Sequence, residues 1–573
     1  MIRSWRRVLP AVVVAAVLSV GYLLAPPLGT DLSAQVARAD FFAAHGFTPI
    51  DLRWYGGVDQ FGYSLVSPAL MGGLGTRNTA IFSLLTAALA FAALLVRAGV
   101  RRPVLGGVVG ALCIAGNLAS GRVTYGLGVA FGLLALLALT VPNRGLRYGG
   151  AAVAGLLAGL TSPVAGLFVG LAGAALLLSG GRTGGTRGGG TRTAGAVLAA
   201  VGALGLGLTG LLFGEGGVMN ISAKDTRGAV LVSLLVALFA AHRPVRVGAL
   251  LSAAGVLAAY LVDTPVGLNA TRLAVMFALP VLAATGTTPR RPVGAGPHAP
   301  EQADPAAAPP TAGARVLLPD PFGPESGHPD PAVTHLPLRP PPGAVLAPAG
   351  FTPARWGGAI LVGALVWWLA PPVVVADLRD AGNPANERSY FTPLITALKE
   401  HHATRTEVVP TRNYWEAAYV APLARGWLRQ LDLERNPLLY ENLPGGTKLT
   451  ADNYRDWLRD NAVSHVAVSD AEPSWLARPE AALVRSGGLP YLTEVWHDEH
   501  WRLYAVADPA PVVEGLVDQD AVSVTFAAEA PGGRLVRVRY SRWLRMPGGT
   551  LRPGPGGWTT AEVPGPGLFR VSS

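Results

Sequence analysis

Charged residues and cysteines are scarce in this chain. Of its 573 residues only 14% are Asp, Glu, Lys or Arg, whereas 50% are hydrophobic. At a mean hydropathy of +0.37, the chain is too apolar for a soluble protein of this size. Cys113 is the only cysteine, which excludes an intrachain disulfide and any cysteine-based zinc site. The composition therefore predicts a polytopic α-helical membrane protein.

Motifs for phosphate cradling and for metal binding are also missing. The glycine-rich segment 181–190 has neither a GKS element nor a G-x-G-x-x-G element after a strand, so it is not expected to bind phosphate. The histidines lack a third convergent ligand and are expected to be surface residues. These are His401, His402, His497 and His500. No metal site is predicted.

Positive charge is in excess, with a formal net charge of +10 and an isoelectric point near 9.9. The arginines cluster in short loops between apolar runs. There they set membrane topology and contact anionic lipid headgroups. The expected partner is therefore the lipid bilayer, and no nucleic-acid partner is expected.

Apolar runs long enough to cross a membrane recur along the first half of the chain. About 20 residues span the hydrocarbon core. We predict spans at 8–26, 78–96, 103–119, 123–141, 194–213, 228–241, 247–263, 269–286 and 357–375, and one longer run at 148–179.

The long run is predicted to be two tightly joined helices. Basic residues flank both of its ends, so the positive-inside rule places both ends in the cytoplasm. Thr161, Ser162 and Pro163 supply a break in its middle, because proline lacks a backbone donor and disfavours helix in the preceding residue. About eleven membrane segments result. The N-terminus is then cytoplasmic, the first span is an uncleaved signal anchor, and the C-terminal region is extracytoplasmic.

The predicted domains follow from these spans. Residues 1–286 form the transmembrane bundle, with a long first external loop at 27–77. Residues 287–356 are rich in Pro, Ala and Gly and predict a disordered cytoplasmic linker. The last transmembrane helix occupies 357–376. Residues 377–573 predict an extracytoplasmic α/β domain with a β-rich C-terminal part.

Several elements of the C-terminal domain can be placed by pattern. Thr450 is expected to cap an amphipathic helix that leads to a strand at His465–Ser469. Further predicted elements are a strand at 407–410, a helix at 479–485, a hairpin of 492–497 with 502–506, and strands at 522–527 and 535–540. The last of these are separated by Pro-Gly turns, which favour a β-rich end.

This organisation resembles the GT-C class of integral-membrane glycosyltransferases. The resemblance is carried by Thr30-Asp31-Leu32, the turn His45 to Pro49, Trp54-Tyr55-Gly56-Gly57, and the segment from Gly62-Tyr63 to Ser67-Pro68. Large bacterial relatives also have segments similar to Tyr390 to Leu394 and Tyr414 to Ala417. The resemblance implies a bacterial envelope enzyme of the cell membrane. It implies a polyprenyl-phosphate sugar donor, a catalytic carboxylate just beyond the first span, and a glycan, lipid or protein acceptor in the cell envelope.

Three aspartates of the first external loop are candidates for the catalytic base. Transfer of a sugar to a hydroxyl needs a carboxylate that accepts the hydroxyl proton. Asp31 lies at the membrane boundary, where desolvation would raise its pKa; its alternative role is that of a helix N-cap. Asp40 lies in an expected interfacial helix whose Phe41 and Phe42 face lipid. Asp59 lies in the second half of the loop. The alternative for both is a solvated loop charge.

Cations are needed to hold the departing phosphate. Arg122, between two spans, and Arg272, just inside a span, are candidates because arginine binds phosphate oxygens bidentately; either could instead snorkel to lipid headgroups. Arg53 is a weaker candidate. Trp54 and Tyr55 could stack on a sugar ring. The loop aspartates could hold a divalent cation with the phosphate, although their spacing does not dictate ligation.

Two other classes of function remain open. A secondary transporter would explain the broken run at 148–179, since interrupted helices mark transport sites. Few charges lie within the spans, however, and the span pattern has no two matching halves. A non-catalytic protein of envelope assembly would explain the large external domain. Only the loss of activity in aspartate variants separates that function from an enzyme.

Overall fold

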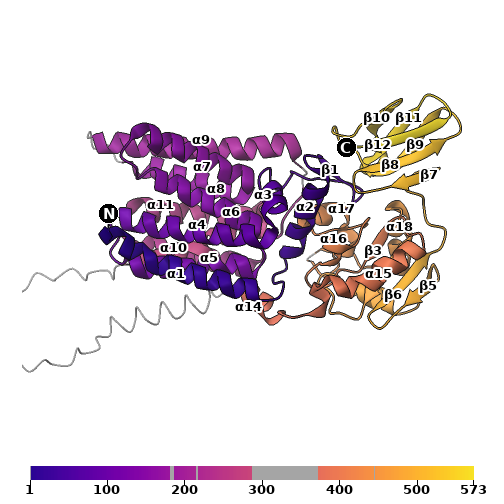
Figure 1. Ribbon diagram of the computed structural model, residues 1–573, viewed down its shortest axis with the longest axis horizontal. Helices are drawn as coiled ribbons and strands as arrows, with labels where there is room; N and C mark the ends of the chain where they lie inside the picture. Colours follow the sequence, from indigo (N-terminus) through magenta and orange to yellow (C-terminus); the bar gives the residue numbers. More distant parts are fainter. Residues whose placement is uncertain (1, 181–185, 215–216, 287–371, 444) are drawn as a thin grey trace, which may run out of the picture. The chain divides into compact units, whose positions relative to one another are not determined.

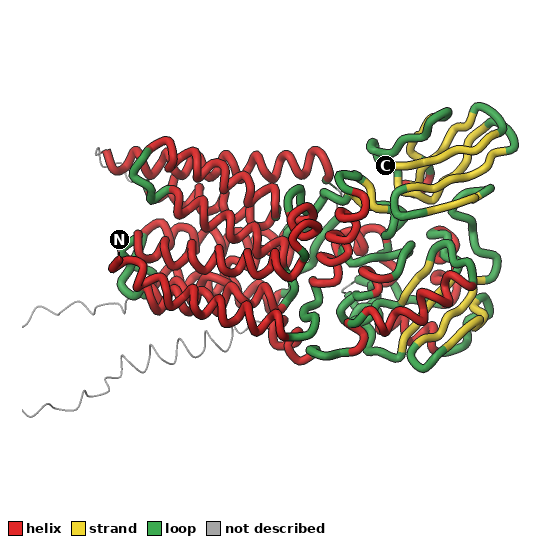
Figure 2. Tube along the Cα trace, viewed as in Figure 1, coloured by secondary structure: helices red, strands yellow, loops and turns green. Residues whose placement is uncertain are grey.

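The computed structural model describes residues 2–180, 186–214, 217–286, 372–443 and 445–573. Its N-terminal part is helical, and small sheets gather in its C-terminal part, as Figure 2 shows. Within these residues, five helical segments are long and apolar enough to cross a membrane, and three shorter apolar helices accompany them. The long ones are Trp5–Leu24, Thr76–Arg97, Gly190–Phe213, Arg243–Leu261 and Gly267–Thr285. Such a set of helices is typical of a multi-pass membrane protein.

The helices of the N-terminal part match the predicted runs (Figure 1). They are α1 (Ile2–Leu24), α4 (Thr76–Arg97), α5 (Pro103–Ala119), α6 (Val123–Ala138), α7 (Arg144–Thr161), α8 (Pro163–Ser179), α9 (Thr186–Phe213), α10 (Ala223–Phe239), α11 (Arg243–Leu261) and α12 (Arg272–Thr285), the last preceded by the 3-10 turn η1 (Gly267–Thr271). The linker at 287–356 and most of the predicted span at 357–375 lie outside the described residues. The number and orientation of membrane crossings stay predictions.

The predicted break in the long run is confirmed. Helix α7 ends at Thr161, and Ser162 is extended, with φ −147° and ψ 116°. The Ser162 hydroxyl accepts the Ala165 N–H at 3.5 Å, and Pro163 is the first residue of α8. Proline fits this position because the first helical N–H has no partner within the helix.

The loop at 27–77, which is predicted to be external, folds into four short elements. These are α2 (Leu32–His45), the two-stranded pair β1 (Ile50–Asp51) and β2 (Val58–Asp59), and α3 (Ser67–Leu74). The expectation that Phe41 faces lipid is wrong. Its side chain is 1% exposed and lies under the Arg53 guanidinium, whose carbon is 4.9 Å from the ring centroid. Helix α2 therefore packs inward through this residue.

The first half of the C-terminal domain holds a mixed four-stranded sheet in the order β3-β4-β6-β5. Its strands are β3 (Thr406–Val408), β4 (His465–Ser469), β5 (Leu492–His497) and β6 (Trp501–Val506), with α15 (Arg388–Glu400), α18 (Ala451–Asp460) and α19 (Arg478–Arg485). Thr450 caps α18 in a capping box with Asn453, as its spacing predicts. The predicted hairpin is the antiparallel pair of β5 and β6.

The end of the chain forms two three-stranded antiparallel sheets, β10-β11-β9 and β12-β8-β7. The strands are β7 (Leu516–Gln519), β8 (Ser523–Ala528), β9 (Gly532–Arg539), β10 (Thr550–Pro553), β11 (Trp558–Val563) and β12 (Gly567–Ser572). Buried side chains such as Val536, Phe526 and Val571 form their core. The predicted β-rich end is thus confirmed.

Candidate functional site

Asp31 faces a cation rather than its own helix. It occupies the N-cap position of α2, but its side chain makes no capping hydrogen bond to the described backbone there. Instead its Oδ2 accepts a hydrogen bond from Arg122 Nε at 3.0 Å. The two side chains are 15% and 22% exposed, so the pair is largely shielded yet open on one side. The capping role is therefore not observed.

Three other elements hold the backbone around Asp31. The Thr30 N–H donates to Asp377 Oδ1 at 3.2 Å, the Thr30 carbonyl accepts from Trp427 Nε1 at 2.8 Å, and the Asp31 N–H donates to the Ser120 carbonyl at 3.3 Å. Asp377 lies in α14 (Pro372–Arg379) and is 3% exposed. Burial raises the pKa of Asp377, while its hydrogen bonds and Arg122 oppose this effect. The position of Asp31 is thus set by contacts from distant parts of the chain.

Tyr125 interacts with both predicted arginines, Arg122 and Arg272. The Arg272 guanidinium carbon lies 4.8 Å from the centroid of the Tyr125 ring, and Arg122 interacts electrostatically with the same tyrosine. Arg272 Nη1 is buried without a hydrogen-bond partner among the described residues. A buried donor of this kind is expected to meet water or an anion. The structure therefore pairs Asp31 with Arg122, and it places Arg272 on Tyr125.

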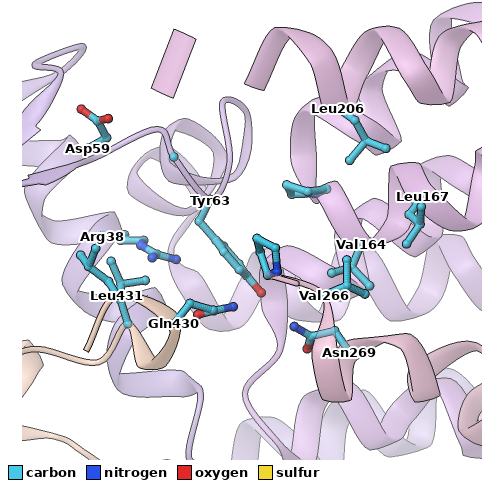
Figure 3. A pocket seen from close by; sticks show the side chains of 14 residues that line it. Arg38, Asp59, Tyr63, Val164, Leu167, Leu206, Val266, Asn269, Gln430 and Leu431 are labelled. Atoms are coloured by element: carbon cyan, nitrogen blue, oxygen red, sulfur yellow. The ribbon is translucent and has the colours of Figure 1, made fainter. Parts of the chain in front are cut away.

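The structure also has a cavity of about 260 Å³ (Figure 3). In the figure the Tyr63 ring points towards Asn269 and Val266. The cavity has a polar part and an apolar part. Its lining residues are Arg38, Asp59, Gly62, Tyr63, Pro163, Val164, Leu167, Leu206, Pro265, Val266, Asn269, Leu428, Gln430 and Leu431. They come from the loop at 27–77, α8, α9, the turn before α12 and the C-terminal domain.

Two cavity-lining residues, Tyr63 and Gln430, have neighbours that interact with the arginines or with Asp31. Tyr63 lies beneath the Arg38 guanidinium, whose carbon is 4.7 Å from the ring centroid, and it also interacts with Tyr125. Gln430 lines the cavity and follows Arg429, the first residue of α17 (Arg429–Arg435). Burial by itself would lower the pKa of Arg429, but nearby tyrosines and Asp31 outweigh this effect, and the pKa is raised. Asp31, Arg122 and Arg272 are not among the residues that line the cavity, so the ion pair is linked to it only through these neighbours.

The remaining predicted aspartates have different surroundings. Asp59 lines the cavity, as Arg38 does. Asp40 is not among the cavity-lining residues and lies towards the end of α2. Desolvation raises the pKa of Asp40, while Arg53 and Arg388 partly offset this effect. No group of three or more His, Cys, Asp or Glu side chains that could hold a metal ion occurs in the described part of the chain. A divalent cation held together with phosphate stays a prediction.

Arg53, Trp54 and Tyr55 fasten the loop to its surroundings. Arg53 pairs with Asp51 at 2.7 Å and donates to the Ala37 carbonyl at 2.7 Å. Trp54 and Tyr55 are 1% and 2% exposed; Trp54 Nε1 donates to the Ala417 carbonyl at 3.0 Å and the Tyr55 hydroxyl to the Leu428 carbonyl at 3.4 Å. In this arrangement the three side chains have packing roles. Their contact with substrate stays a prediction.

Sequence reasoning missed several residues of the site. Arg38, Asp377, Arg429 and Gln430 lie far apart in the sequence and share no motif. The only sequence feature that marks Asp377 is its position directly after the last apolar run. For Arg429 and Gln430 we find no local signal, because tertiary contacts alone bring them to the cavity.

Gly62 offers a test of the cavity wall. A Cβ at this position would lie 2.8 Å from the Phe213 carbonyl oxygen at the end of α9, so the backbone must shift. We expect Gly62→Ala to destabilise the protein by about 1–3 kcal/mol and to displace Tyr63. Gly73→Ala is the control, because no described atom lies within 4 Å of its added Cβ and alanine favours helix. Thermal unfolding in detergent measures both. Equal melting temperatures would contradict the tight contact.

Comparisons with known proteins identify no relative. No protein-family model matches the chain, and no curated protein matches it. The likeness to GT-C glycosyltransferases therefore rests on the quoted residues and on the order of helices, external loop and C-terminal domain.

Proposed function

We propose that this chain is a GT-C type membrane glycosyltransferase. It moves a sugar from a polyprenyl-phosphate donor to a glycan, lipid or protein acceptor on the extracytoplasmic side of the cell membrane. The observation that carries the proposal is the shielded Asp31–Arg122 pair at the start of α2. The chain also has a cavity with polar and apolar lining residues. Transfer from a lipid phosphate requires a base, cations and an apolar surface, and these features would supply them.

Each polar group has a role in the proposed reaction. Asp31 accepts the proton of the acceptor hydroxyl while the hydroxyl oxygen bonds to the anomeric carbon of the sugar. The bond between that carbon and the phosphate oxygen breaks, and the polyprenyl phosphate leaves with the electron pair. Arg122 and Arg272 stabilise the charge that grows on the departing phosphate. Asp59 and Gln430 line the space in which the sugar would lie.

The apolar wall suits the start of a lipid chain. It includes Val164 and Leu167 of α8 and Leu206 of α9, and both helices are apolar. Ligand pockets are typically about 300–1,000 Å³, so a cavity of about 260 Å³ holds a sugar-phosphate head rather than a whole polyprenyl lipid. The remaining chain would extend along the helices into the bilayer.

A secondary transporter is the second candidate. Pro163 and Val164 at the α7–α8 break line the cavity, and broken helices line substrate sites in transporters. A transporter would move a solute without consuming a polyprenyl-phosphate sugar. A non-catalytic assembly protein would do neither.

Photo-crosslinking tests the placement of the lipid. A polyprenyl phosphate that carries a photoreactive group near its phosphate should label peptides from α8 and α9. Leu206→Trp places a larger side chain in the cavity and should reduce labelling several-fold. Leu204→Trp is the matched control on the same helix, because Leu204 is 50% exposed and does not line the cavity. The proposed donor site would be contradicted if both variants were labelled equally and if an excess of unlabelled polyprenyl phosphate did not reduce the labelling.

A further inference from the structure

Helix α9 ends in a row of aromatic rings. Phe213, its last residue, has its ring centroid 5.3 Å from that of Phe61 and 5.5 Å from that of Trp543. Phe61 in turn stacks with Phe47 at 6.1 Å, and Phe47 meets Phe42 edge-on at 5.0 Å. These five residues, the aromatic row, come from the first external loop, α9 and the β-rich end of the chain.

The position of Phe213 sets the height of the row relative to a membrane. The apolar segment Gly190–Phe213 has 24 residues and is therefore about 36 Å long, slightly more than the roughly 30 Å of the hydrocarbon core. Its end must lie where acyl chains meet headgroups. Aromatic side chains are enriched at this depth in membrane proteins. The rings of Phe61 and Trp543, which pack on Phe213, therefore lie near the same depth in the membrane.

The β-rich end of the chain is fastened at the same point. Arg542 donates to the Leu211 and Leu212 carbonyls at 2.7 and 2.6 Å, and Trp543 Nε1 donates to the Leu212 carbonyl at 3.4 Å. Carbonyls in the last turn of a helix lack partners within the helix and attract cations. The turn at 541–545 thus caps α9 while it places Trp543 in the row.

Exposed apolar side chains lead up to the row. Leu204, Leu208 and Leu211 are 50%, 37% and 78% exposed and recur at helical spacing on one face of α9. In a membrane-spanning helix such a face contacts lipid. Phe47, in the row beyond this face, is 74% exposed. Phe47 is joined to the end of α9 through the buried Phe61 ring, so lipid is the expected partner of this exposed ring as well.

We infer that the aromatic row is a second membrane contact, in which Phe47 inserts into the headgroup layer of the leaflet where α9 ends. The partner is the phospholipid bilayer itself. This contact would hold the first external loop and the β-rich end at a fixed height above the hydrocarbon core. The inference concerns lipid binding and stands whether or not the chain is a glycosyltransferase.

Depth-dependent fluorescence quenching tests the contact on the full chain in lipid nanodiscs. In a Cys113→Ser background, Phe47→Cys carries an environment-sensitive fluorophore. Leu568→Cys is the control, because Leu568 is 66% exposed on β12 and outside the row. Leu211→Cys reports a lipid-facing helix position. Lipids with a nitroxide either near the headgroup or near the chain end serve as quenchers.

The expected result is at least a twofold stronger quenching of the Phe47 probe by the shallow nitroxide than by the deep one, with little quenching of the Leu568 probe. Quenching at Leu211 shows that the chain is inserted. Equal, weak quenching at Phe47 and Leu568 would overturn the inference. So would a Phe47 probe that is shielded only in self-associated protein, which would identify a second copy as the partner. Absence of quenching at Leu211 would overturn it as well, because α9 would then not be a membrane span.

Discussion

Asp31→Asn is expected to lower sugar transfer by about 10²–10⁴-fold, the usual cost of losing a general base. Asparagine keeps the shape of the side chain and one carbonyl oxygen for the hydrogen bond from Arg122 Nε. It removes the negative charge and the ability to take a proton. The loss should therefore fall on kcat, while the protein level in the membrane stays the same. The initial rate of transfer from labelled donor measures the effect.

Two variants separate loss of the base from loss of structure. Asp518→Asn makes the same change on β7, where Asp518 is exposed, and should leave transfer unchanged. Arg122→Gln breaks the same ion pair from the other side, and should retain more activity than Asp31→Asn because the base remains. Wild-type transfer by Asp31→Asn would rule out Asp31 as the base. Asp59→Asn and Asp40→Asn would then be the next variants to measure.

Arg272→Gln is expected to raise the KM for the polyprenyl-phosphate donor by roughly 10- to 150-fold, which corresponds to about 1.5–3 kcal/mol for a hydrogen bond to a charged group. Its Nη1 is buried without a hydrogen-bond partner in the described residues, so this nitrogen can donate a hydrogen bond to an anion. The donor phosphate is charged before the reaction begins. Removing its partner therefore weakens binding more than it slows turnover.

Steady-state kinetics at varied donor concentration measure this change. Arg246→Gln is the matched control, because Arg246 is exposed on α11. A KM equal to that of the wild type would show that Arg272 has no contact with the donor. A fall in kcat at unchanged KM would instead assign Arg272 to the transition state alone.

The helices and the break between α7 and α8 could be predicted because their signals are local. Runs of apolar residues of membrane length have few alternative structures, and Ser162-Pro163 combines a good N-cap with a good first helical residue. The same holds for Thr450, which caps α18. Helix ends were less accurate: α9 begins at Thr186 rather than 194, because polar residues can extend a helix beyond its apolar run.

The site could be predicted only where a residue stood out against an apolar background. Asp31, Arg122 and Arg272 met that condition; the structure pairs the first two, and the roles of all three stay predictions. Arg38 and Gln430 did not, because their role depends on contacts between residues hundreds of positions apart. Trp54 and Tyr55 show the opposite difficulty. An aromatic pair in a polar loop suggests a sugar platform, yet both rings are buried against the C-terminal domain.

Transfer by the purified full chain in liposomes decides between the functions. A panel of polyprenyl phosphates, each carrying a different labelled sugar, is presented with extracts of cell-envelope acceptors, and movement of free sugars across the liposome membrane is recorded in parallel. The proposed function predicts that label passes from one donor to an acceptor in the wild type and not in Asp31→Asn. Movement of a solute by wild-type protein that transfers no label from any donor would contradict it.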